Sequence, residues 1–237
     1  MTDALFRDDA YLKSCDATVL AVTERGGVVL DRTIFYPTGG GQPGDSGTMR
    51  CADGSCIRIA TTVKGETPDG IVHVPAEGQA LPEVGSAVKL ELDWDRRHAH
   101  MRMHTCLHLL SAVLTYPVTG GQVGAEKSRL DFDIPEAVLD KDEITAKLNE
   151  LIARDAPVGM RWITDAELAA QPDLVKTMSV QPPTGAGHVR LIEVEGMDLQ
   201  PCGGTHVART GEIGAVEVRK IEKKGRQNRR VSIQFAS

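Results

Sequence analysis

The first 92 residues alternate short apolar runs with polar, turn-forming clusters. The apolar runs lie at residues 17–22, 28–30, 57–63, 71–74 and 88–92, and groups of Gly, Asp and Pro separate them. Short runs bounded by turn-forming residues are typical of strands. Several of them in succession predict a small β-barrel or sandwich over this part of the chain.

One stretch within this region fits neither a strand nor a helix. Residues 33–47 read Thr-Ile-Phe-Tyr-Pro-Thr-Gly-Gly-Gly-Gln-Pro-Gly-Asp-Ser-Gly. Glycine and proline interrupt both kinds of regular backbone. The sequence therefore predicts an irregular, glycine-rich segment between two strands.

The spacing of the apolar residues changes after residue 92. Residues 96–115 contain neither Gly nor Pro. Their apolar side chains recur three or four positions apart, at Met103, Leu107, Leu110 and Leu114. This spacing predicts a helix, which we expect Asp95 to cap and Tyr116-Pro117 to end.

A second helix and four strands are predicted further along the chain. The helix covers residues 141–154, with an apolar face formed by Ile144, Leu148, Leu151 and Ile152. Strands are predicted at residues 158–163, 189–194, 215–221 and 231–235. We therefore expect an α+β protein with two domains, a β-barrel-like domain at residues 1–92 and a mixed α+β domain at residues 93–237.

The composition is that of a protein with a substantial core. The 237 residues are 41% hydrophobic and 25% charged, which suits one large domain or two small ones. No apolar stretch approaches the roughly 20 residues that cross a bilayer, so we expect no membrane association. Five cysteines are an odd number. They do not indicate a disulfide framework, and we expect a reducing, cytoplasmic setting.

The net charge of −6 argues against a nucleic-acid partner, but the charges are unevenly distributed. Residues 1–92 hold 8 basic and 13 acidic side chains, whereas residues 93–237 hold 19 and 20. Between residues 219 and 230, seven Lys and Arg stand against one Glu. A local patch can bind phosphate on an acidic chain, but a solvated β-hairpin is the favoured interpretation of this run, and the run alone does not establish a phosphate site.

Two histidines, His104 and His108, lie four residues apart on the first predicted helix. Side chains at this spacing are neighbours on a helix surface, so both imidazoles can reach one ion. Two surface histidines explain the pair equally well. The zinc-protease motif needs a glutamate after its first histidine. Thr105 occupies that position here, so the pair does not indicate a protease.

A thiol and a third imidazole follow nearly a hundred residues later, in Cys202-Gly-Gly-Thr-His206. The two glycines let this loop wrap closely around an ion. Three histidines and one cysteine form a ligand set that favours Zn²⁺ over Mg²⁺ or Ca²⁺. We predict one Zn²⁺ held by His104, His108, Cys202 and His206. A buried cysteine beside solvated histidines is the alternative.

The number of ligands leaves the role of such an ion open. Four ligands complete the tetrahedron of a structural zinc, whereas a catalytic zinc keeps one position for water or substrate. A loosely bound histidine, a histidine that carries protons beside the ion, or five-coordination would reconcile the set with catalysis.

Four segments occur in the order in which they stand in the editing regions of alanyl-tRNA synthetases. They are Phe35-Tyr-Pro-Thr-Gly-Gly-Gly-Gln-Pro-Gly-Asp45, Arg102-Met-His-Thr-Cys-Leu-His-Leu-Leu110, Gly121-Gln-Val-Gly-Ala-Glu-Lys-Ser-Arg-Leu-Asp-Phe132 and Cys202-Gly-Gly-Thr-His206. Over residues 30–235 the chain resembles the free-standing alanyl-tRNA editing proteins, the AlaX group, in their medium-length form. The threonyl-tRNA synthetase editing domain shares the His-x-x-x-His and Cys-x-x-x-His spacings. The glycine-rich segment is similar to the alanyl side.

This resemblance implies a β-barrel domain packed against a zinc-bearing editing domain. It also implies a zinc-dependent deacylase that hydrolyses seryl-tRNA(Ala), with glycyl-tRNA(Ala) as a further substrate. The metal role falls on His104, His108, Cys202 and His206. The other matched positions are Gln122 in the amino-acid pocket and a rim or acceptor-end contact formed by Gly39, Gly40, Gly41 and Gln42.

Further candidates come from the chemistry of ester hydrolysis. The backbone N–H groups of Gly203 and Gly204, next to Thr205, are candidates to stabilise a developing oxyanion. Arg226 and Arg229 are candidates to contact tRNA. A second, hydrolytic site is needed because a pocket sized for alanine admits glycine and rejects serine only about 10²-fold.

The expected partner is the acceptor end of aminoacylated tRNA(Ala), with no membrane and no obligate protein partner. With only 4% aromatic residues, we expect recognition through the RNA backbone and the terminal adenosine rather than through base stacking. Two other functions stay open. One is a deacylase for a different aminoacyl-tRNA, and the other is a non-catalytic tRNA-binding module with structural zinc.

Overall fold

The computed structural model describes residues 2–67, 70–135, 138–178 and 187–236. The chain divides into two compact units, residues 1–98 and 99–237. The division falls inside the long helix α1 (Trp94–Val113) rather than before it. Each unit is described separately below.

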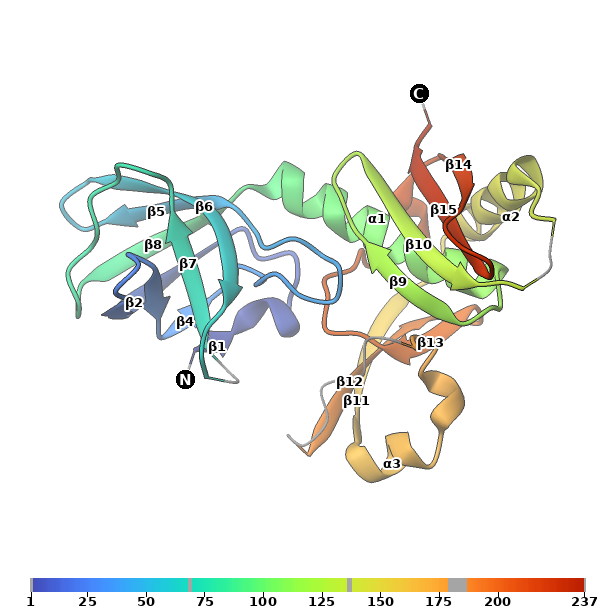
Figure 1. The fold of residues 1–237 in the computed structure, drawn as a ribbon. Coiled ribbons are helices and arrows are strands. Elements are labelled where there is room, and N and C mark those ends of the chain that lie inside the picture. Colours follow the sequence, from blue (N-terminus) through green and yellow to red (C-terminus); the bar gives the residue numbers. More distant parts are fainter. Residues whose placement is uncertain (1, 68–69, 136–137, 179–186, 237) are drawn as a thin grey trace. The chain divides into compact units, whose positions relative to one another are not determined.

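The first unit contains a closed, six-stranded antiparallel barrel (Figure 1). Around the barrel its strands are β2 (Ser14–Val22), β3 (Val28–Leu30), β7 (Ile71–Pro75), β6 (Cys56–Lys64), β5 (Gly47–Cys51) and β8 (Ala87–Leu92). Side chains alternate between the barrel core and solvent, so Ile57 and Ile59 are buried while Arg58 is exposed. The predicted barrel is confirmed. The sequence pattern missed β5, where Met49 is the one buried apolar residue.

Short elements precede and flank the barrel. Strands β1 (Asp3–Ala4) and β4 (Arg32–Thr33) pair in parallel, and the 3₁₀ helix η1 (Leu5–Arg7) lies between them in sequence. The barrel core includes Leu30, Phe35, Met49, Ile59 and Leu90, all with no exposed surface.

The glycine-rich segment is irregular in its interior, as predicted. Gly40 and Gly41 have φ of 55° and 81° and form a tight turn, in which Gly39 and Gln42 exchange two backbone hydrogen bonds of 3.1 and 2.9 Å. At Gly44 a side chain is impossible, because a Cβ would overlap the carbonyl of Thr62. Glycine at these positions lets the segment fold tightly back on the barrel.

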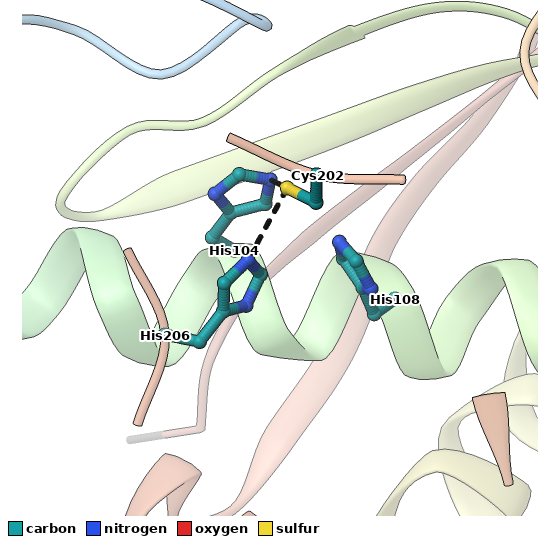
Figure 2. Close-up of side chains that lie close together, drawn as sticks. All are labelled: His104, His108, Cys202 and His206. Atoms are coloured by element: carbon teal, nitrogen blue, oxygen red, sulfur yellow. Dashed lines mark hydrogen bonds between the residues drawn. The ribbon is translucent and has the colours of Figure 1, made fainter. Parts of the chain in front are cut away.

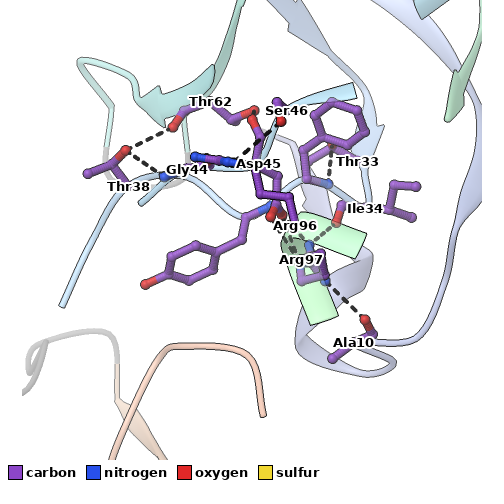
Figure 3. Close-up of polar contacts among 12 residues, drawn as sticks. Ala10, Thr33, Ile34, Thr38, Gly44, Asp45, Ser46, Thr62, Arg96 and Arg97 are labelled. Carbon is purple, nitrogen blue, oxygen red and sulfur yellow. Dashed lines mark hydrogen bonds and ion pairs between the residues drawn. The ribbon is translucent and has the colours of Figure 1, made fainter. Parts of the chain in front are cut away.

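A buried ion pair holds the end of this segment (Figure 3). Asp45 accepts hydrogen bonds from Arg97 Nε at 3.1 and 2.9 Å and from Arg97 Nη2. The same guanidinium donates to the carbonyl oxygens of Ala10 (3.0 Å) and Ile34 (2.7 Å). Asp45 also accepts from the Tyr36 N–H at 2.6 Å. Because both charged side chains are nearly fully buried, each depends on the other for its charge compensation.

In its described residues, the second unit contains two antiparallel sheets, most of helix α1 and two further α-helices (Figure 1). One sheet has the order β14 (Val216–Lys223), β15 (Asn228–Phe235), β10 (Lys127–Asp133) and β9 (Val118–Gln122). The other has the order β11 (Val158–Thr164), β12 (His188–Val194) and β13 (Asp198–Pro201). The helices besides α1 are α2 (Lys141–Ala153) and α3 (Asp165–Ala169), with 3₁₀ turns η2 (Pro172–Leu174) and η3 (Thr210–Ile213). The mixed α+β fold class is confirmed.

Several predicted boundaries need correction. Helix α1 begins at Trp94, so Asp95 lies in its first turn and is not its cap. Asp93 precedes the helix and accepts from the Arg96 N–H at 3.4 Å.

Helix α2 is capped by Asp140 and buries Ile144, Leu148 and Ile152. Leu151 lies at the edge of that face and is only partly buried.

All five cysteines are free thiols. Among the described residues, no helix combines the length and the apolar character that a membrane crossing needs.

We expect Asp45→Asn to lower the free energy of unfolding by about 3–5 kcal/mol, because Arg97 would keep its charge in a buried site without a carboxylate. Urea unfolding of the full chain measures the change. Glu91→Gln is the matched control, since Glu91 pairs at 3.5 Å with Arg50 and both side chains are exposed. That variant should lose less than about 1 kcal/mol. Equal losses in the two variants would contradict the role of the buried pair.

Candidate metal centre

Two of the candidate ligands lie on consecutive turns of α1. His104 and His108 face the same side of the helix, with ring centroids 5.4 Å apart. Their exposed fractions are 7% and 5%. Fully buried apolar residues, including Met101, Leu109 and Leu110, anchor the rest of the helix. The helix therefore presents both imidazoles at the edge of the core.

The other two candidates lie in the loop that follows β13. Arg190 of the neighbouring strand β12 fixes this loop, because its Nη1 donates to the carbonyls of Cys202 (3.1 Å) and Gly204 (2.8 Å). The Cys202 N–H donates to the Arg190 carbonyl at 3.1 Å. Within the loop, the Gly204 N–H donates to Cys202 Sγ at 3.4 Å.

The structure brings all four candidate ligands together (Figure 2). Their ligand atoms lie within 4.8 Å of one another. Cys202 Sγ is 3.3 Å from His206 Nε2 and 3.6 Å from His104 Nε2. A tetrahedral zinc with bonds of 2.0–2.3 Å has edges of roughly 3.3–3.8 Å between its ligands. The cluster can therefore hold a metal ion.

A threonine fixes which nitrogen of His206 is available to an ion. Thr105 Oγ1 donates to the Met101 carbonyl at 2.9 Å, so it accepts the hydrogen bond from His206 Nδ1 at 3.1 Å. The proton of His206 is thereby held on Nδ1, and the lone pair of Nε2 points toward Cys202.

A carboxylate performs the same task for His108. Asp198 Oδ2 accepts from His108 Nδ1 at 3.0 Å, which leaves Nε2 for an ion. Gln200 Nε2 donates to the same carboxylate at 2.7 Å, and Lys176 Nζ donates to its other oxygen at 2.5 Å. Carboxylate–histidine pairs of this kind orient the ligands of many zinc sites.

The surroundings of Cys202 and His206 favour the forms of these two residues that bind metal. Burial by itself raises the pKa of the Cys202 thiol, but the imidazoles of His104 and His206 outweigh it and hold that pKa well below its ordinary value. Burial and the neighbouring His104 ring lower the pKa of His206 to about 3. Thiolate and neutral imidazole are the ligating species.

His108 behaves differently from His206. Burial lowers its pKa, but hydrogen bonds with Asp198 and Cys202 outweigh burial and raise it to about 9. Burial raises the pKa of Asp198, but His108 and Lys176 bring it down to about 2. A metal ion must therefore displace a proton from His108, and binding becomes more favourable as the pH rises.

Other candidates from the sequence lie outside the cluster. Gln122 is exposed on β9, and its Oε1 accepts from Arg129 Nε at 3.3 Å. Gly203 is exposed, whereas Gly204 and Thr205 are buried within the loop. Gly40 and Gly41 are exposed at the turn of the first unit, Gly39 is half-buried, and the side chain of Gln42 is buried. Arg226 is exposed in the β14–β15 connection, and Arg229 is half-buried.

Sequence reasoning missed the residues that orient the ligands. Asp198, Gln200 and Cys202 alternate along one segment, so a strand there places them on the same side. That alternation was available in the sequence. Thr105 was recognised only as the absence of a glutamate. Its role depends on the Met101 carbonyl one turn earlier, which no residue pattern displays.

Comparison with known proteins agrees with the geometry. The family described as threonyl and alanyl tRNA synthetase second additional domain matches residues 189–232, and class II (A) tRNA synthetases match residues 9–96. The alanyl-tRNA editing protein AlaX-M of Methanosarcina mazei is 38% identical, and the match covers 98% of this chain and 95% of that protein. The AlaX-M protein of Saccharolobus solfataricus is 34% identical over 98% of both chains.

A longer enzyme contains a related region. The alanine–tRNA ligase of Pyrobaculum calidifontis is 38% identical over 94% of this chain, but the match spans 25% of the ligase. Given the two nearly full-length matches to free-standing proteins, the chain belongs to the AlaX-M family of alanyl-tRNA editing proteins.

We expect Asp198→Asn to weaken metal binding about 10–100-fold, because His108 would lose the charged acceptor that orients its ring. Titration with Co²⁺, followed by the absorption bands of the metal–thiolate complex, measures the affinity. Glu193→Gln is the matched control, as Glu193 is an exposed carboxylate on the neighbouring strand β12. An Asp198→Asn affinity equal to that of the control would contradict the orienting role.

Proposed function

We propose that this chain is a zinc-dependent trans-editing deacylase. Its substrates are mischarged tRNA(Ala), chiefly seryl-tRNA(Ala), with glycyl-tRNA(Ala) as a second. The observation that carries the proposal is the cluster of three imidazoles and one thiol, in a chain that matches alanyl-tRNA editing proteins over 98% of its length. The substrate is found in the cytoplasm, which is the compartment we propose.

His104, His108, Cys202 and His206 would hold the zinc ion. When bound, Zn²⁺ supplies a Lewis acid beside the ester. Asp198 and Thr105 accept hydrogen bonds from Nδ1 of His108 and His206, which would leave both Nε2 atoms free to bind the ion. Cys202 is partly exposed and the three imidazoles keep 5–7% of their surface. A substrate would therefore approach the ion from the side of Cys202, the only one of the four ligands that is not buried.

The loop residues would act on the ester itself. The Gly204 N–H is engaged by Cys202 Sγ, which leaves the exposed Gly203 as the stronger candidate for an oxyanion donor. Thr205 is buried beside His206 and would set the position of that ring. Gln122 remains our candidate for a contact with the amino-acid moiety. The exposed Gly40 and Gly41, together with Arg226 and Arg229, remain candidates for the acceptor end.

The direct test is release of serine from seryl-tRNA(Ala). We expect release with one bound Zn²⁺, and sparing of alanyl-tRNA(Ala) and threonyl-tRNA(Thr). His108→Ala should slow release at least about 100-fold, since a Lewis acid contributes several kcal/mol to the barrier. His188→Ala, which changes an exposed histidine outside the cluster, should leave the rate unchanged.

The outcomes of this assay separate the alternatives. Unchanged release by His108→Ala would exclude the metal mechanism. Release from threonyl-tRNA(Thr) in place of seryl-tRNA(Ala) would indicate a different deacylase. Salt-sensitive tRNA binding without any release would indicate a binding module with structural zinc.

A pair of variants tests the oxyanion donor. Gly203→Pro removes the backbone N–H and should lower kcat about 10²–10³-fold. Gly203→Ala keeps the N–H, and its Cβ meets no heavy atom within 4 Å, so its kcat should stay close to that of the unmodified chain. Elemental analysis checks that both variants retain one Zn²⁺. A proline variant with normal kcat would remove Gly203 from the mechanism.

A further inference from the structure

The sheet β14-β15-β10-β9 carries a hollow on its outward face. Its volume is about 650 Å³. The cationic side chains that line it are Lys127, Arg129, Arg219, Lys220 and Arg230. None of the four residues of the metal cluster belongs to its lining. The hollow therefore does not include the metal ligands, although Gln122, our candidate for the contact with the amino-acid moiety, is one of its lining residues.

The strand register explains why these side chains gather on one face. On β15, Arg230 and Ser232 face the hollow, while Val231 and Ile233 alternate with them and are fully buried. The neighbours across the strands follow the same alternation, because Arg129 lies opposite Ser232, and Glu222 lies opposite Arg230. The outward face is therefore polar over three strands.

A β-bulge adds one more cation to this face. The pairing of β14 with β15 shifts between Val218 and Lys220, so Arg219 is an extra residue without its own partner. Arg219 and Lys220 are both exposed, and both line the hollow. In a regular strand, two consecutive residues would point to opposite faces.

The cations outnumber the acids. Five basic side chains line the hollow against two carboxylates, those of Glu126 and Glu222. Behind the lining, Asp131 holds two guanidinium groups, with Arg129 at 2.7 Å and Arg230 at 2.7 and 2.8 Å. Burial raises the pKa of Asp131, but these arginines outweigh it and lower that pKa. One carboxylate thus fixes two arginines in place and leaves one of their charges uncompensated.

Two of the remaining three cations are available to a ligand, whereas Lys220 pairs with Glu222 at 3.2 Å. Within the described part of the chain, neither Lys127 nor Arg219 forms an ion pair. Pre-oriented guanidinium groups match the oxygen pairs of a phosphate. The lining contains no aromatic side chain on which a base could stack. These properties suit an RNA backbone better than unpaired bases.

We propose that this hollow binds backbone phosphates of the tRNA substrate. The proposal rests on the proposed function and adds a surface to it. The sequence alone predicted Arg226 and Arg229 as tRNA contacts. We now expect the main contact with the RNA backbone to be made by Lys127, Arg129, Arg219, Lys220 and Arg230. Arg229 alternates with Arg230 along β15, and so lies on the strand face opposite the hollow.

Binding of uncharged tRNA(Ala) tests the proposal independently of hydrolysis. We expect the double variant Lys127→Ala/Arg219→Ala to bind at least about fivefold more weakly, with a salt dependence reduced by about one to two phosphate contacts. Fluorescence anisotropy at several salt concentrations measures both quantities. The control Lys147→Ala/Arg154→Ala makes the same charge change on the exposed face of α2 and should bind normally.

Kinetics distinguish this surface from the metal centre. With seryl-tRNA(Ala), the hollow variant should show a raised KM, while kcat at saturation and the zinc content stay unchanged. Unaltered tRNA binding by the hollow variant, or equal weakening by the control, would overturn the proposal. Equal affinity for inorganic phosphate and for tRNA would also overturn it, since that result indicates a site for a single anion. Absence of serine release would reject the deacylase function. The binding of uncharged tRNA(Ala) would then decide on its own whether the hollow binds RNA.

Discussion

The site depends on hydrogen bonds that determine where the imidazole protons reside. Three imidazoles and a thiolate can share one small volume only if their lone pairs point inward and their protons point outward. Thr105 and Asp198 impose this arrangement on His206 and His108. Two elements of the fold position these two hydrogen-bond acceptors. Helix α1 brings Thr105 with the histidines, and strand β13 brings Asp198 toward the same place as Cys202.

Much of the fold follows from local patterns. Five of the six barrel strands, both long helices and four strands of the second unit are visible as apolar runs with the period of a strand or a helix, whereas barrel strand β5 is not. The missed strands are those whose sequences lack such runs. Strand β9 contains two adjacent glycines, β10 alternates charged residues with its apolar ones, and β13 has four residues of which two are buried and polar. Their pairing partners, rather than their own propensities, make them strands.

In the candidate site, the metal ligands can be predicted from the sequence, but the residues that orient them cannot. Ligand types and spacings mark His104, His108, Cys202 and His206, because a metal imposes its chemistry on the residues that bind it. The orienting residues carry no such mark. Lys176 reaches Asp198 from a segment 22 positions away, and Arg97 meets Asp45 across 52 positions. Only the tertiary structure reveals which polar residue meets which.

The bulge in β14 also explains how its sequence remains compatible with a core. Had the strand paired regularly beyond Val218, Arg219 would have stood opposite Ser232, Lys220 would have pointed into the interior, and Ile221 into water. The extra residue shifts the register of β14 by one position. Beyond the bulge, apolar side chains therefore face the core again, and Ile221 pairs with the buried Val231. Deletion of one residue elsewhere in β14 would shift the register again. The apolar side chains beyond the deletion would then face solvent, and the charged side chains would face the core.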